Sequence, residues 1–173
     1  MTTNDTLDPF HHLHDEGYAA TFAQTLFTHV SMVAMGGRQT TSLNGLWHFT
    51  LDLFDEGLRQ KWFADEPTPA IDWVRPRDYD AGAGQTINVP SCWTMAQPAW
   101  HFFEGGSWYT RLLPGDAPVA QPRTVLRIGA AASHARVFLD GVCLGTHQGA
   151  STPFFVELTP YLKAGATHRL QIN

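Results

Sequence analysis

Short runs in which apolar and polar positions alternate recur over the last two thirds of the chain. A run of four or more residues with period two, rich in β-branched and aromatic types, predicts a strand. Eight runs fit: 46–51, 86–89, 108–113, 124–128, 135–139, 142–146, 154–158 and 168–172. No amphipathic helix is predicted between them, so the pattern indicates an all-β fold, an antiparallel jelly-roll or similar β-sandwich.

The Asp140-Gly141 dipeptide separates two of these runs. It predicts a two-residue type I′ turn, because both residues of such a turn need positive φ angles. The predicted register pairs Leu139 with Val142, Phe138 with Cys143 and Val137 with Leu144. Both faces of the hairpin are then apolar, which favours a strand pair inside a sheet over one at its edge.

The rest of the chain is less regular. Residues 1–40 show no sustained period and are predicted to form an irregular N-terminal arm, followed by one domain over residues 41–173. Residues 54–85 carry scattered prolines together with Trp62 and Trp73, which is typical of a long insertion held down by aromatic side chains.

Charge and hydropathy narrow the classes of partner. The formal net charge is -5 without a basic stripe, which excludes nucleic acid and anionic membranes as expected partners. No signal peptide and no apolar run of membrane-spanning length is present, so a cytoplasmic location is predicted. The two cysteines, Cys92 and Cys143, are predicted to be reduced and partly buried.

Two groups of residues are candidates for chemistry. His11, His12 and His14 could bind zinc or nickel, but no further ligand follows at a fixed distance, so neither a metal site nor a cofactor is predicted. The loop 91–106 is the most aromatic of the chain. The rings of Trp93, Trp100, Phe102 and Phe103 could stack on a sugar ring or pack against another domain, and Trp93, Trp100 and Phe103 are the candidate sugar contacts.

Five segments, in this order, resemble motifs of glycoside hydrolase family 2. They are 42–49 (SLNGLWHF), 88–93 (NVPSCW), 104–111 (EGGSWYTR), 135–149 (ARVFLDGVCLGTHQG) and 152–162 (TPFFVELTPYL). The resemblance covers residues 40–173 and is to the sugar-binding domain of β-glucuronidases and β-galactosidases. It implies a galactose-binding-like jelly roll.

In that family an immunoglobulin-like domain and a (β/α)₈ barrel follow this domain, and the barrel holds both catalytic glutamates. A barrel takes about 250 residues, so no catalytic residue is expected in this chain of 173 residues. The resemblance implies a truncated part of a retaining hydrolase, inactive alone. Its expected partners are a β-glycoside bound by the full-length enzyme, the two other domains and a further copy in a homo-oligomer.

The resemblance also implies two substrate-binding residues in the full-length enzyme, Glu157 and His147. The family often has Asp where this chain has Glu157, a second Gly where it has Ala150, and Tyr where it has Phe103. Two alternatives remain open: a stand-alone carbohydrate-binding module, which should bind sugar by itself, and a small metal-binding β-barrel enzyme, which should retain metal after dialysis.

Overall fold

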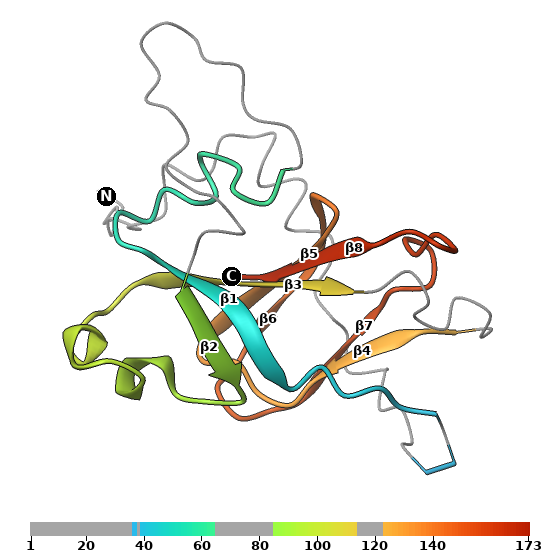
Figure 1. Cartoon of the computed structure of the whole chain (residues 1–173), viewed down its shortest axis with the longest axis horizontal. Helices are drawn as coiled ribbons and strands as arrows, with labels where there is room; N and C mark the ends of the chain where they lie inside the picture. The colour runs from blue at the N-terminus through green and yellow to red at the C-terminus, as the bar shows by residue number, and fades with distance from the viewer. Residues whose placement is uncertain (1–35, 38, 65–84, 114–122) are drawn as a thin grey trace, which may run out of the picture.

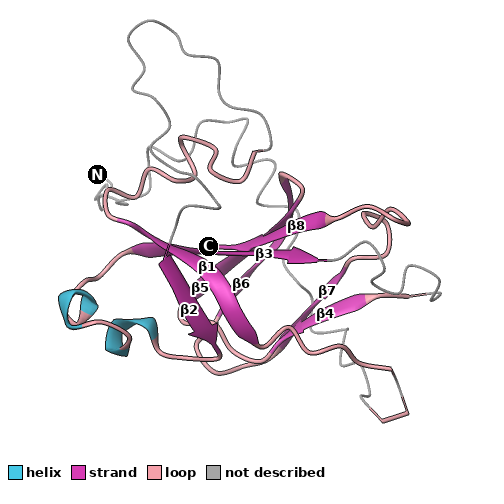
Figure 2. Cartoon of the chain, in the orientation of Figure 1, coloured by secondary structure: helices cyan, strands magenta, loops and turns pink. Residues whose placement is uncertain are grey.

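The computed structural model describes residues 36–37, 39–64, 85–113 and 123–173, and most of the described chain is strand and loop (Figures 1 and 2). The strands are β1 (Gly45–Asp52), β2 (Gln85–Val89), β3 (Gly106–Leu113), β4 (Val125–Ile128), β5 (His134–Leu139), β6 (Val142–Gln148), β7 (Phe154–Glu157) and β8 (His168–Ile172). Two single-turn 3-10 helices, η3 (Trp93–Met95) and η4 (Pro98–Trp100), lie between β2 and β3. The all-β prediction is confirmed.

The strands form two antiparallel sheets. Six make one sheet in the order β2-β1-β3-β8-β5-β6, and β4 pairs with β7 in the other. Side chains of both sheets meet in one core, to which the larger sheet contributes Trp47, Val137 and Leu170 and the smaller one Leu126 and Val156. The predicted β-sandwich is therefore present, with its main core between the sheets.

The outer face of the six-stranded sheet is covered by the turns that follow β1, residues 53–63, called the covering turn below. Leu58 and Trp62, from the turns after β1, pack on the buried side chains of Trp108 and Phe138. This contact confirms that Trp62 fixes the start of the insertion, whereas Trp73 lies outside the described residues. The sheet is thus buried on both sides in its central strands, which explains why β3 and β5 carry apolar residues on both faces.

One buried carboxylate holds this cover in place. Asp52 is 2% exposed, and its Oδ1 accepts a hydrogen bond of 2.8 Å from the backbone N–H of Glu56. Its Oδ2 accepts bonds from the N–H of Gly57 at 2.8 Å and from the indole Nε1–H of Trp108 at 3.2 Å. Asp52 therefore connects the end of β1, the covering turn and β3.

The β5–β6 hairpin agrees with the prediction only near its turn. Asp140 and Gly141 have φ angles of 47° and 81°, as a type I′ turn requires. The pairs Leu139 with Val142 and Phe138 with Cys143 are confirmed. The predicted pairing of Val137 with Leu144 is wrong: Val137 lies opposite Gly145, because Leu144 is the extra residue of a β-bulge.

The prediction of an interior hairpin is half wrong. β5 does lie inside the sheet, between β8 and β6, and its apolar side chains are buried on both faces. β6 is an edge strand, and its first residue, Val142, is exposed. Apolar residues on both faces of β6 were therefore a poor guide to its place in the sheet.

The side chain of Asp140 fastens the hairpin turn to β8. Its Oδ1 accepts a 2.7 Å hydrogen bond from the N–H of Arg169, and its Oδ2 lies 2.5 Å from Nδ1 of the buried His168. Nε2 of His168 accepts a 2.9 Å bond from the N–H of Lys163, so Nδ1 carries the imidazole proton. The turn is consequently part of the packed domain and not a free loop.

We expect Gly141→Val to lower the free energy of unfolding by more than about 1 kcal/mol, because a β-branched residue is strained at positive φ. Gly141 has a φ of 81°, and its neighbour Asp140 is held by two hydrogen bonds, so the turn cannot relax freely. The measurement is the midpoint of denaturant unfolding. An unchanged midpoint would show that the turn tolerates another backbone conformation.

Candidate functional site

His147 lies on the core side of β6, against the first residue of β7. Its ring stacks on that of Phe154 at a centroid distance of 4.1 Å, and its Nε2 lies 3.3 Å from the hydroxyl oxygen of Thr152. The backbone of Gly149 lies close to both side chains, since a Cβ at this position would lie 2.9 Å from Thr152 Oγ1 and 3.0 Å from His147 Nε2. The loop from β6 to β7 is thus packed tightly around the imidazole.

The bulge explains why His147 faces this way. With the predicted register, His147 would lie opposite His134 on the outer face of the sheet. The extra residue at Leu144 shifts the strand by one position, so that His147 lies opposite the buried Ala135 instead. A shift of one residue moves every following side chain to the other face of a strand.

Glu157 ends β7 at the rim of the smaller sheet, between the buried Val156 and Leu158. Its side chain is 42% exposed. Arg123 donates from Nε to one of its oxygens, Oε2, at 3.0 Å, and Nη2 of the same guanidinium lies 2.9 Å from that oxygen in an ion pair. The sequence singled out Glu157 but not Arg123, since an exposed arginine beside a proline-rich connector has no distinguishing pattern.

The structure places the two predicted substrate-binding residues at opposite ends of β7. His147 touches Phe154, the first residue of the strand, whereas Glu157 is the last. Three residues of strand span about 10 Å. The chain therefore does not bring His147 and Glu157 into one cluster, and a role for either in substrate binding stays a prediction.

The three predicted aromatic contacts pack within the domain. Trp93 in η3 and Trp100 in η4 flank the buried ring of Phe49, at centroid distances of 6.1 and 5.1 Å. Phe103 meets Trp93 at 5.9 Å, and all three side chains are half-buried. The exposed ring of this loop is Phe102, at 94%. This packing gives the three aromatics a structural role, and a sugar contact for them is untested.

The aromatic cluster lies at the adjoining end of the core, where the ring of Tyr109 faces that of Phe49 at a centroid distance of 4.9 Å. Burial raises the pKa of the Tyr109 phenol to about 12, since the charged phenolate is poorly solvated there, and the nearby Cys92 adds to the rise. The loop of η3 and η4 therefore closes one end of the sandwich.

The comparison with known families decides what this sandwich is. The model of the glycosyl hydrolases family 2, sugar binding domain, matches residues 40–173. The chain belongs to this family. Human β-glucuronidase is 31% identical over 133 residues, which are 74% of this chain and 19% of that protein, and the enzyme of Paenibacillus borealis is 25% identical over 135 residues.

Solved structures agree. The β-glucuronidase of an uncultured Clostridium species superposes with a TM-score of 0.63 at 27% identity, over 86% of this chain and 23% of that one. The β-glucuronidase of Lactobacillus rhamnosus superposes with a TM-score of 0.61 at 25% identity, over 81% of this chain and 22% of that one. The fold is thus the galactose-binding-like β-sandwich of family 2, and the chain spans about a fifth of the length of its relatives.

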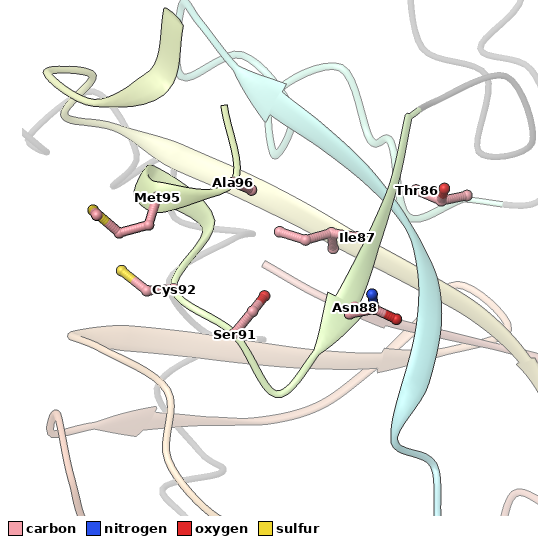
Figure 3. Close-up of a pocket in the computed structure, with 7 residues that line it drawn as sticks. All are labelled: Thr86, Ile87, Asn88, Ser91, Cys92, Met95 and Ala96. Atoms are coloured by element: carbon pink, nitrogen blue, oxygen red, sulfur yellow. The ribbon is translucent and has the colours of Figure 1, made fainter. Parts of the chain in front are cut away.

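The sugar-binding domain also has a surface pocket of about 420 Å³ beside the edge strand β2 (Figure 3). The side chains around it come from β2 and from residues 91–96, a segment that contains η3: Thr86, Ile87, Asn88, Ser91, Cys92, Met95 and Ala96. In Figure 3 the sulfur-bearing side chains of Cys92 and Met95 extend from the same side of that segment. The pocket therefore holds an exposed thiol at its rim.

The exposure of Cys92 differs from the prediction. It was expected to be partly buried but is exposed, whereas Cys143 is half-buried, and both thiols are unpaired. Burial raises the pKa of the Cys143 thiol, against smaller opposing effects from a backbone hydrogen bond of Gly145 and from the charge of Arg136. A raised pKa leaves less thiolate at neutral pH.

We expect iodoacetamide to alkylate Cys92 well before Cys143, because the reagent attacks an exposed thiolate. The measurement is mass spectrometry of peptides from the native chain at successive times. In denaturant both thiols should react at similar rates, which serves as the control. Equal rates in the native chain would contradict the described burial of Cys143.

The domain has no evident metal centre in its described part. No group of three or more His, Cys, Asp or Glu residues there is placed to hold a metal ion. His11, His12 and His14 lie outside the described residues. Within residues 36–37, 39–64, 85–113 and 123–173, no helix has the length and hydrophobicity to cross a membrane.

Proposed function

We propose that this chain is the non-catalytic sugar-binding domain of a longer family 2 hydrolase that acts on β-glycosides, as the β-glucuronidases it resembles do. The observation that carries the proposal is the extent of the match. The family model covers residues 40–173, yet the matched region is only 19% of human β-glucuronidase. The chain thus accounts for one domain of such an enzyme.

Chemistry supports a non-catalytic role. A retaining glycosidase needs two carboxyl groups about 5 Å apart on either side of the glycosidic bond, and in this family they are expected in the barrel domain. No barrel fits within 173 residues. The immunoglobulin-like and barrel domains are the proposed partners, together with a further copy in a homo-oligomer, and the cytoplasmic location remains a prediction.

The geometry favours a domain that supplies one wall of a cleft over a stand-alone module. His147 is half-buried against Phe154 and Thr152, and Glu157 lies at the other end of β7. A monosaccharide in contact with Glu157 alone would have few partners in this chain. Strong binding therefore requires further groups, which the barrel domain would provide.

The test has two arms. The purified chain should hydrolyse neither nitrophenyl β-glucuronide nor the β-galactoside or β-mannoside, and should show no measurable affinity for the sugars. In the full-length hydrolase, Glu157→Gln should lower kcat/KM by roughly 10- to 100-fold with little change in folding, since a hydrogen bond to a charged acceptor is lost. Turnover by the isolated chain that disappears when one of its own carboxylates is replaced would overturn the proposal.

A further inference from the structure

Glu157 is not a free carboxylate, because one of its two oxygens is occupied. Nε and Nη2 of Arg123 lie 3.0 and 2.9 Å from Oε2. Among the described residues, no hydrogen bond reaches the other oxygen, Oε1. The guanidinium thus leaves one acceptor of Glu157 available, and a carboxylate oxygen can accept hydrogen bonds from sugar hydroxyls.

The backbone around the pair is fixed on both sides. The N–H of Leu158 donates to the carbonyl oxygen of Thr124 at 2.9 Å, and the N–H of Thr124 donates to Thr159 Oγ1 at 2.8 Å. Val125 lies directly opposite Glu157 in the register of β4 and β7. Arg123 is therefore the diagonal cross-strand neighbour of Glu157, within reach of a long side chain.

The ion pair of Arg123 and Glu157 is expected to contribute little to the stability of the domain. The side chains of Arg123 and Glu157 are 48% and 42% exposed. Exposed ion pairs contribute little to folding, because water already solvates both charges and both side chains lose freedom. What the pair does restrict is the direction of the Glu157 carboxylate, since two donors on one rigid fork converge on one oxygen.

We propose that Arg123 is a positioning residue that holds Glu157 so that its second oxygen faces the bound β-glycoside. The inference rests on the proposed function, in which Glu157 contacts the substrate. Arg123 itself does not touch the sugar. A carboxylate that is free to rotate would present its oxygen in the right direction only part of the time, and small misplacements of a contact group weaken transition-state binding.

The test uses four variants of the full-length hydrolase. Arg123→Ala should lower kcat/KM roughly tenfold while the unfolding midpoint stays unchanged, and Arg123→Lys should restore part of the loss, because an ammonium can donate to Oε2 without the planar fork. In the Glu157→Gln background, Arg123→Ala should have no further effect, since the two residues act through one interaction.

Arg127 provides the matched control. It is an exposed arginine on the same strand, β4, and is the other diagonal neighbour of Glu157, but of the two arginines the structure pairs only Arg123 with that carboxylate. Arg127→Ala removes the same charge from the same strand, and kcat/KM should stay within about twofold of wild type, as expected for a surface change. Equal losses in Arg123→Ala and Arg127→Ala would show a general charge effect and overturn the inference.

The remaining outcomes separate the inference from the proposed function. If Glu157→Gln is impaired but Arg123→Ala has wild-type kinetics, the positioning role is wrong and the proposed function stands. If Glu157→Gln itself has wild-type kinetics, the substrate contact is wrong and the role of Arg123 falls with it. Additive losses in the double variant would show that Arg123 acts independently of Glu157 and would also overturn the inference.

Discussion

Replacing Asp52 by Ala should lower the free energy of unfolding by about 3 to 5 kcal/mol, because the buried acceptor of three hydrogen bonds is removed. The carboxylate is 2% exposed and accepts three hydrogen bonds, from the N–H groups of Glu56 and Gly57 and from the indole of Trp108. Without it, three donors beneath the covering turn lose their acceptor, and a buried polar group without a partner costs about 1 to 3 kcal/mol.

Denaturant unfolding followed by tryptophan fluorescence measures this loss. Asp52→Asn should have an intermediate effect, because the amide keeps one acceptor oxygen but turns an NH₂ group toward a donor. Glu104→Ala is the matched control, since it removes an exposed carboxylate and should change stability by less than about 0.5 kcal/mol. Equal midpoints for Asp52→Ala and Glu104→Ala would refute the bridging role of Asp52.

Gly57→Ala should destabilise the domain by about 2 to 3 kcal/mol, although it adds a single methyl group. A Cβ on Gly57 would lie 2.3 Å from Nε1 of Trp108 and 2.5 Å from Oδ2 of Asp52. Both neighbours are buried and hydrogen-bonded to each other, so neither can move aside without breaking that bond. The glycine is required here by the close approach of the turn to the sheet.

Gly129→Ala separates this steric cost from the general effect of alanine on the unfolded chain. Among the described residues, no atom outside the two chain neighbours lies within 4 Å of a Cβ at Gly129. The substitution should be neutral or slightly stabilising, because alanine restricts the unfolded chain. The comparison is the difference in unfolding midpoint between the two variants. A Gly57→Ala protein as stable as Gly129→Ala would mean that the covering turn lies farther from Trp108 than described.

The strands and the turn at Asp140-Gly141 could be predicted because period-two alternation and turn chemistry are local properties. The family could be recognised from motifs that span residues 40–173. The bulge at Leu144 could not, because the residues after it, Gly145, Thr146 and His147, carry no apolar alternation whose phase would reveal an extra residue. That one residue decided which face His147 occupies.

The contacts between residues far apart in the sequence could not be predicted from local patterns. Asp52 directly follows the predicted run 46–51, and its bond to Trp108 joins residues 56 positions apart. Arg123 follows a proline-rich connector, and its partner Glu157 comes 34 positions later. Sequence patterns report on the neighbours of a residue along the chain, and these pairs become visible only when two strands are brought side by side.

The place of β8 has a consequence for how the domain forms. β1, β2 and β3 pair among themselves and β5 pairs with β6, but β3 and β5 are joined only through β8, which follows every other strand in the sequence. Gln171 on β8 donates to Thr110, 61 positions earlier. Closing such long loops is slow, and domains dominated by distant contacts fold in milliseconds to seconds. A ribosome must therefore release nearly the whole domain before its larger sheet can become one cooperative unit.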